Sequence, residues 1–414
     1  MEKSKANWGI NVSCILTFIV IFVSNDTLLF GTNRDRTFFW LHVGILIACF
    51  SYILFHTPNV CKNAVFFLLF LMSAMAITQI VNLDEEIIKY VYNAFALLLC
   101  MLFCRCVNKR DFCRAYTSII YYITVFACLL FMLWIFAEPI ARMFPSIANE
   151  NDIRYYFFGL GFLEDLKTGV LPRMYGIFRE PGVFACFLIM ALIIQLFFEE
   201  KLNVKRIVII SVAAILTFST AAYVLVFFVL GGYFVKQIFA GDKGDRKVWL
   251  LLLILTLVFA TLFAAIGSEK IFGVVFNKLE VENSSRDSRF GSIGANLEMF
   301  LENPIFGKGW NYVEENFTYF SSQGEYKGAH NTNTFLKFLA LYGIGPFLCV
   351  VCATFLFFKK MCKSALWGIF TMAIWIVALS NEDLSVNVLF YILPFYAFEK
   401  EEKRREPTLE NIIN

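Results

Sequence analysis

Long apolar runs alternate with short polar segments along almost the whole chain. An apolar run of about twenty residues is long enough to cross a bilayer as a helix, which satisfies its own backbone hydrogen bonds there. We therefore predict an all-α polytopic integral membrane protein, a single transmembrane domain over residues 1–414 with about twelve transmembrane helices. The predicted spans are 9–30, 38–55, 64–81, 90–104, 117–137, 182–198, 206–219, 221–239, 248–267, 331–358, 365–380 and 385–398.

The run from Ile207 to Phe239 is too long for one span and short for two, and Ser219-Thr220 is the predicted break. The first run, from Ile10, has no small-residue cleavage site behind it, so we expect it to remain as a helix. Basic residues gather in every second short loop, which predicts that both termini are cytoplasmic. Residues 399–414 are then a solvated cytoplasmic tail.

Two extracytoplasmic segments are long in this topology, residues 138–181 and residues 268–330. We expect both to contain helices. Long loops with their own structure are often functional. A transporter would more often place its special polar groups inside its helices, near the middle of the membrane. The chemistry is therefore expected at the outer surface.

The composition is typical of a membrane protein, and it gives no indication of a nucleic-acid partner. Of the 414 residues, 59% are hydrophobic and 17% are charged, whereas a soluble domain carries about 25% charged residues. The net charge of +3 and the absence of a basic block give no indication of nucleic-acid binding. The 12 cysteines fall in apolar runs or short basic loops, as expected for reduced thiols, and Cys104, Cys106 and Cys113 do not have the spacing of a zinc site.

The second long segment is predicted to contain an amphipathic helix after Ser284. Its apolar residues at helical spacing are Phe290, Ile293, Leu297, Phe300 and Leu301. Asn303-Pro304 and the following glycines are expected to end it. Arg286 and Arg289 would lie with Ile293 on the inward face, where two guanidinium forks could hold a phosphate group. The alternative is that they contact lipid headgroups or pair with Glu282 and Asp287.

The first long segment ends in a string of charged residues just before a predicted span. Arg173, Arg179 and Glu180 precede Pro181, which suits the first turn of a helix. Arg179 and Glu180 would then lie at the outer membrane surface. They could bind substrate, or they could simply anchor the helix end at the interface.

His330 is the histidine of an outer segment, and it leads directly into an apolar run. A histidine there could act in acid–base catalysis, or it could be structural. Asn331 and its neighbours can cap the next helix. Lys337 would lie on the same helical face as His330, and a buried cation needs a task or a partner, such as Glu382 or Asp383.

Other sites are weakly indicated. Asp84, Glu85 and Glu86 are consecutive, so they do not share a face that could hold a metal. No nucleophile elbow, HExxH pattern, phosphate loop or dinucleotide fingerprint occurs in a suitable context. We therefore expect neither a metal nor another cofactor.

Three strings resemble a known family. RMYGIFREPG, from Arg173 to Gly182, resembles a segment of bacterial O-antigen and capsule repeat-unit polymerases. NPIFGKG, from Asn303 to Gly309, and HNTNTFLKFLALYGIG, from His330 to Gly345, are similar to segments of the O-antigen polymerase and ligase superfamily. Many relatives have an acid before the later glycine, where this chain has Tyr342, so no acidic role there carries over.

The resemblance implies glycosyl transfer without metal or nucleotide at the outer face of the bacterial cytoplasmic membrane. The donor would be a glycan on undecaprenyl pyrophosphate, and the acceptor a second lipid-linked repeat unit in a polymerase or lipid A–core in a ligase. It implies that Arg173, Arg179, Arg286 and Arg289 bind the pyrophosphate, and that Glu180 or His330 takes a proton from the acceptor. Asn331 and Lys337 would support the site.

Membrane lipids, a chain-length regulator and a flippase are the further partners that such a polymerase implies. A flippase for lipid-linked oligosaccharides and a non-enzymatic exporter are the remaining alternatives. A flippase would need charged residues lining a central cavity, and Lys337 is essentially the only candidate in the predicted spans.

Overall fold

The computed structural model describes residues 2–23, 27, 36–56, 61–148, 153–156, 161–165, 172–239, 284–323, 330–385 and 387–399. The predicted span 248–267, the beginning of the second outer segment and the tail beyond Glu399 lie outside these residues, as does the side chain of Arg286. The predicted helical, polytopic architecture of the membrane domain is confirmed. Six described helices are long and apolar enough to cross a membrane, and three shorter helices are also apolar.

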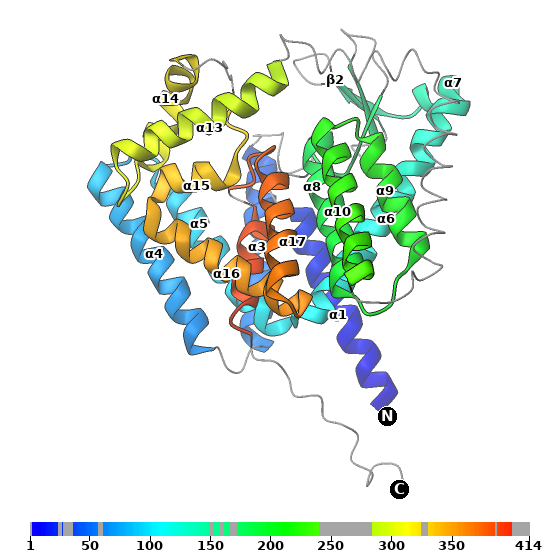
Figure 1. Ribbon diagram of the computed structural model, residues 1–414, viewed down its shortest axis with the longest axis horizontal. Helices are drawn as coiled ribbons and strands as arrows, with labels where there is room; N and C mark the ends of the chain where they lie inside the picture. Colours follow the sequence, from blue (N-terminus) through cyan, green and yellow to red (C-terminus); the bar gives the residue numbers. More distant parts are fainter. Residues whose placement is uncertain are drawn as a thin grey trace, which may run out of the picture.

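The helices pack side by side, with two further helices and a small sheet at one end of the molecule (Figure 1). The packed helices are α1 (Glu2–Val23), α3 (Arg36–His56), α4 (Lys62–Asn82), α5 (Ile87–Cys106), α6 (Lys109–Phe136), α8 (Pro181–Ile193), α9 (Val204–Leu216), α10 (Thr220–Phe239), α15 (Thr334–Tyr342), α16 (Ile344–Cys362), α17 (Ala365–Leu379) and α18 (Val388–Tyr396). Helices α13 (Ser284–Glu302) and α14 (Gly309–Gln323) lie at the end opposite the beginning of α1 (Figure 1).

Helix α8 is the centre of the bundle. It begins at Pro181, as predicted, and continues as a π-helical turn, η2 (Ile194–Phe198). Almost every side chain from Pro181 to Phe197 is buried, which fits a helix that is apolar on all sides and enclosed by neighbours. It contacts α9, α10 and α17, and its first turn contacts the sheet. The charged string before Pro181 therefore leads directly into the most deeply buried of the six candidate spans.

The first long segment, residues 138–181, contains a helix as predicted, but it is mainly a sheet, which was not predicted. After the short helix α7 (Glu138–Arg142), four antiparallel strands follow in chain order. They are β1 (Ser146–Ala148), β2 (Ile153–Tyr156), β3 (Gly161–Asp165) and β4 (Arg173–Gly176), and Leu163 pairs with Arg173. Aromatic and β-branched residues favour strands, and Tyr155, Tyr156 and Tyr175 are buried in this sheet. Hydropathy runs do not detect strands this short.

The predicted span 331–358 is also wrong in detail, because it is two helices. Helix α15 ends at Tyr342, Gly343 has a φ of 77°, and α16 starts at Ile344. A Cβ on Gly343 would overlap the carbonyl of Ile305. Ile344 N donates to the carbonyl of Pro304 at 2.9 Å. The break therefore makes room for the turn that follows α13.

The predicted break at Ser219-Thr220 is confirmed. Helix α9 ends at Leu216, Phe218 adopts a φ of 49°, and α10 begins at Thr220. All 12 cysteines lie within the described residues and are free thiols.

Candidate active site

Helix α13 is present as predicted, but the face that it turns toward the protein is not the predicted one. Phe290, Ile293, Leu297 and Leu301 are exposed, whereas Ser292, Ala295, Asn296 and Met299 are buried. The prediction assumed that the apolar stripe of a helix faces the protein. In a membrane protein the apolar stripe of a helix need not face the rest of the protein. Here the buried face of α13 carries polar groups that hydrogen-bond to another segment.

The partner of that buried face is the segment that begins at His330. Ser292 Oγ donates to the carbonyl of His330 at 3.2 Å and accepts from Thr332 N at 3.0 Å. Asn296 and Asn331 exchange two side-chain hydrogen bonds of 3.0 and 2.9 Å. Buried amides of this kind are costly unless paired. The Asn331 pair therefore fixes α13 over the start of α15.

The same segment caps α15. Asn333 Oδ1 accepts from Leu336 N at 3.0 Å, as the predicted capping sequence requires. The side chain of His330 is exposed beside these contacts. Its main chain is held while its imidazole is open to solvent, which is compatible with proton transfer to or from a bound molecule.

Thr334 connects α15 to the short turn between α17 and α18. Its hydroxyl donates to the carbonyl of Glu382 at 2.6 Å and accepts from Leu384 N at 2.8 Å. Glu382 is only 7% exposed. A Cβ built on Gly182 would overlap the carboxylate of Glu382, so this carboxylate lies against the first turn of α8.

Arg173 lies in β4 and belongs to the same group. Its Nε donates to the carbonyl of Thr217 at 3.1 Å. Burial lowers the pKa of Arg173 below its ordinary value, the charges of Glu382 and Glu180 act against this shift, and the charge of Arg289 adds to it. The guanidinium nevertheless stays protonated at physiological pH. Arg173 from the first outer segment and Arg289 from the second are therefore close enough for their charges to interact.

Arg179 is directed at the turn that holds Glu382. Its guanidinium lies 3.4 Å from the carboxylate of Glu180 and donates to the carbonyl of Asp383 at 3.3 Å. The side chain of Glu180 is 52% exposed. Of the residues predicted to form the site, the structure thus brings Arg173, Arg179, Glu180 and Arg289 together, while Arg286 lies outside the described side chains.

Lys337 forms an ion pair with Asp383, one of the two partners that the sequence suggested for a buried cation. Its Nζ lies 2.7 Å from Oδ2 of Asp383 and 4.8 Å from the centre of the Trp310 ring, and Glu314 is a second carboxylate at 3.9 Å. Burial would raise the pKa of Asp383, but Lys337 and hydrogen bonds from Ser385 outweigh it, so the pKa is lowered. Lys337 therefore supports the turn that carries Glu382 and Asp383.

The acidic loop after α4 has a structural role. Asp84 is buried, and its carboxylate accepts from Trp310 N, from Asn311 N at 3.2 Å and from the Tyr90 hydroxyl at 2.7 Å. It therefore caps the N-terminus of α14, where a negative charge is favourable. Within the described residues, no group of three or more His, Cys, Asp or Glu side chains could hold a metal ion.

Asp84→Ala is expected to destabilise the protein by about 1–2 kcal/mol, because α14 loses its cap. Thermal unfolding of the purified protein in detergent measures this change. Glu85→Ala is the matched control, since Glu85 is exposed and next to Asp84 in the chain. Equal melting temperatures for the two variants would contradict the capping role.

The two strings NPIFGKG and HNTNTFLKFLALYGIG contact each other directly. Lys308 N donates to the carbonyl of Ala340 at 2.9 Å, and a Cβ on Gly307 would overlap the carbonyl of Leu341. Tyr342, at the position where many relatives have an acid, is buried and accepts from Trp310 Nε1 at 2.8 Å. These strings thus build the platform beneath α13 and α14.

Sequence reasoning missed several members of this site. The sequence indicates Glu382 only as one of two partners for Lys337, and Ser292 and Asn296 are not among the residues predicted for the site. A signal did exist for the two α13 residues, since they are polar at a spacing of four on one face of a helix. No local signal indicates that Glu382 meets Gly182, because 200 residues separate them.

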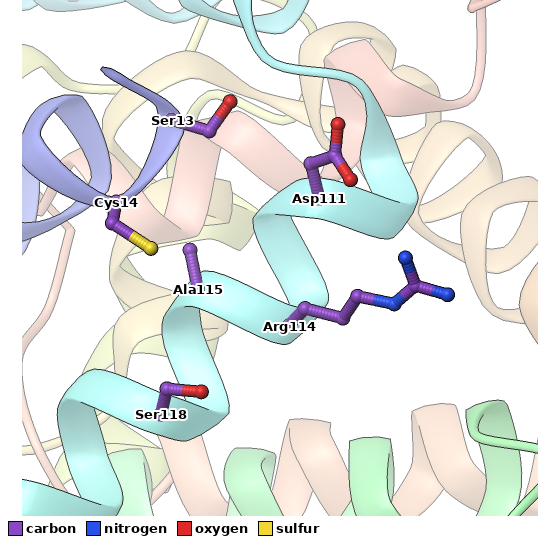
Figure 2. A pocket seen from close by; sticks show the side chains of 6 residues that line it. All are labelled: Ser13, Cys14, Asp111, Arg114, Ala115 and Ser118. Carbon is purple, nitrogen blue, oxygen red and sulfur yellow. The ribbon is translucent and has the colours of Figure 1, made fainter. Parts of the chain in front are cut away.

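A small pocket of about 100 Å³ lies elsewhere, between α1 and the first turns of α6 (Figure 2). It is lined by Ser13, Cys14, Asp111, Arg114, Ala115 and Ser118. The other end of α6 leads into α7 and the sheet. The pocket is therefore at the end of the bundle opposite the arginines, and it is not part of the candidate site.

Comparison with known proteins adds one match. Residues 206–351, about a third of the chain, match the family model described as O-antigen ligase, and this range includes α10, α13, α14, α15 and the beginning of α16. Neither a search of curated proteins nor a search of solved structures found a match. The match bears out the resemblance of the sequence strings: over these residues the chain is similar to the O-antigen ligase family, which is consistent with a Wzy-like protein of the O-antigen polymerase and ligase superfamily.

Proposed function

We propose that the chain polymerises oligosaccharide repeat units carried on undecaprenyl pyrophosphate, at the outer face of the cytoplasmic membrane. The observation that carries this proposal is the interaction between the charges of Arg173 and Arg289, one from each outer segment. Two guanidinium groups whose charges act on each other suit a pyrophosphate, because each can donate two hydrogen bonds to it. The family match supports glycosyl transfer of the polymerase or ligase type.

In the proposed reaction, the bond between the donor sugar and the pyrophosphate breaks as a hydroxyl of the acceptor sugar bonds to the same carbon. The leaving group is undecaprenyl pyrophosphate. Arg173 and Arg289, with Arg179 and Arg286, stabilise the negative charge that grows on it, which is usually the largest contribution to such catalysis. Glu180 or His330 accepts the proton of the attacking hydroxyl. Neither a metal nor a cofactor takes part in this scheme.

The proposed location follows from the distribution of basic residues. Lys109, Lys360 and Lys363 lie at the end of the bundle away from the arginine site, where Lys360 donates to the carbonyl of Ala397 and Lys363 pairs with Glu200. Basic residues in short loops favour the cytoplasmic side. We therefore propose that both termini are cytoplasmic and that the arginine site faces outward.

The description of the matched family favours a second candidate, a ligase that transfers the glycan to lipid A–core or another acceptor lipid. The two activities share the donor and the proposed arginine chemistry, so the acceptor alone separates them. A flippase receives no support. Among the described residues, the buried charged side chains are Asp84, Lys337 and Glu382, and all three lie at the outer end of the bundle.

The experiment is transfer by the purified protein in nanodiscs, without added metal or nucleotide. A polymerase supplied only with a lipid-linked repeat unit is expected to produce a ladder of longer lipid-linked chains. A ligase would produce no ladder and would glycosylate an added lipid A–core acceptor. A flippase could be identified by movement of a fluorescent lipid-linked sugar with no new glycosidic bond. Absence of any product with either acceptor would contradict glycosyl transfer.

A further inference from the structure

The turn between α17 and α18 lies at the candidate site, although it is outside the three sequence strings that resemble the family. Glu382 is a buried charged residue of this turn. The main chain of this residue is fixed, because the hydroxyl of Thr334 bonds to its carbonyl at 2.6 Å and to Leu384 N at 2.8 Å. These two bonds fix the course of the main chain at Glu382, from which its carboxylate extends.

That place is the first turn of α8. The carboxylate of Glu382 occupies the space where any residue other than glycine at position 182 would put its Cβ. The next residue of the turn, Asp383, accepts a hydrogen bond through its carbonyl from Arg179 at 3.3 Å. Two consecutive residues of the turn are thus fitted against the string that runs from Arg173 to Gly182.

The position of Glu382 matters because its negative charge acts on Arg173. Arg173 and Arg289 repel each other, and the charges that oppose this repulsion at Arg173 are those of Glu382 and Glu180. The side chain of Glu180 is 52% exposed, so water and salt weaken its effect, whereas Glu382 is 7% exposed. A buried charge acts through a medium of lower dielectric constant, and its interactions are correspondingly stronger.

We propose that Glu382 is the counterion of Arg173 in the empty site and thereby limits how tightly Arg173 and Arg289 hold a pyrophosphate. It acts through the arginines and is therefore a positioning residue. This inference rests on the proposed function. A diphosphate that enters the site displaces Glu382 as the main negative charge near the pair, and the same carboxylate favours departure of the lipid pyrophosphate after transfer.

The test compares Glu382→Gln with the wild-type protein, both in nanodiscs. The amide keeps the shape of the side chain and removes its charge. Binding of undecaprenyl pyrophosphate is expected to become about tenfold tighter, because the site gains one unit of positive charge. In the transfer assay, both KM for the donor and kcat are expected to fall, since product release becomes slower. Glu382→Asp should restore wild-type affinity.

A merely structural role for Glu382 predicts the opposite sign. Loss of a supporting contact would disorder the arginines and weaken binding, and weaker or unchanged binding by Glu382→Gln would overturn the inference. If Glu382→Gln gives that result while the wild-type protein binds undecaprenyl pyrophosphate and forms product, only the inference about Glu382 fails and the proposed function stands. A wild-type protein that neither binds this lipid nor forms product contradicts the proposed function itself.

The packing against Gly182 has a separate test that needs no substrate. Gly182→Ala is expected to lower the melting temperature, because the new Cβ displaces the carboxylate of Glu382. The loss should be smaller when Gly182→Ala is made in a Glu382→Ala background, where the space is free. Additive effects of the two substitutions would contradict the placement of Glu382 on which the inference depends.

Discussion

Arg289→Ala is expected to reduce glycosyl transfer by about a hundredfold or more, while the protein still inserts into the membrane and remains folded. Removing one group that stabilises a developing negative charge typically costs a factor of about 100–1,000 in kcat. Arg289 is half-buried on α13, and its guanidinium is not needed for packing, because α13 is held by Ser292 and Asn296.

Two further variants make the Arg289 experiment specific. Arg289→Lys keeps the charge but loses the bidentate geometry, so an intermediate rate is expected. Arg142→Ala is the matched control, because Arg142 is an exposed arginine of the same outer region that pairs with Glu138 at 2.8 Å. Product chains are separated on a gel and counted from a radiolabelled donor. Wild-type chain lengths from Arg289→Ala would rule out its proposed role.

Lys337→Met is expected to lower the free energy of unfolding by about 3 kcal/mol, since it leaves the carboxylate of Asp383 without its cation. Lys337 is 7% exposed, and the side chain of Asp383 is 25% exposed, so the effect should lie at the lower end of the range for buried pairs. The matched control is Lys363→Met, which removes an exposed pair with Glu200 and is expected to change nothing measurable.

The same ion pair predicts a dependence on pH. The folded protein lowers the pKa of Asp383 below its unfolded value, which is about 3.9. The pair therefore stabilises the protein fully above that value, and the stabilisation is lost as the pH falls through the folded pKa. Melting temperatures measured across the acidic range should converge for wild type and Lys337→Met. A constant difference at all pH values would show that charge is not the cause.

The membrane architecture could be predicted from the sequence because apolar length is a local property. A run such as residues 64–81 must form a helix in a bilayer whatever surrounds it, and α4 occupies Lys62–Asn82. Helix ends were also predictable where local chemistry decides them, as at Pro181 and Asn333. The sheet of the first outer segment was not, because its strands are short and are stabilised by pairing with one another.

Burial of α13 shows where local reasoning fails. The stripe of Phe290, Ile293 and Leu297 has a helical period, and the period alone does not say which side faces the protein. The choice depends on Ser292 and Asn296, whose partners at His330 and Asn331 lie more than 30 residues away along the chain. Hydrogen bonds between distant segments leave no periodic signal in the sequence.

The sequence by itself determined that this is a helical membrane protein, which strings resemble the O-antigen polymerase and ligase superfamily, and which arginines of its two long polar segments are candidates for binding a pyrophosphate. Only the tertiary structure brought Arg173 and Arg289 within reach of each other's charge, and only it placed Glu382 against Gly182. The physical reason is that apolar length and capping act over a few neighbouring residues. The balance of charge at a site depends on distances in space between residues that the chain keeps far apart.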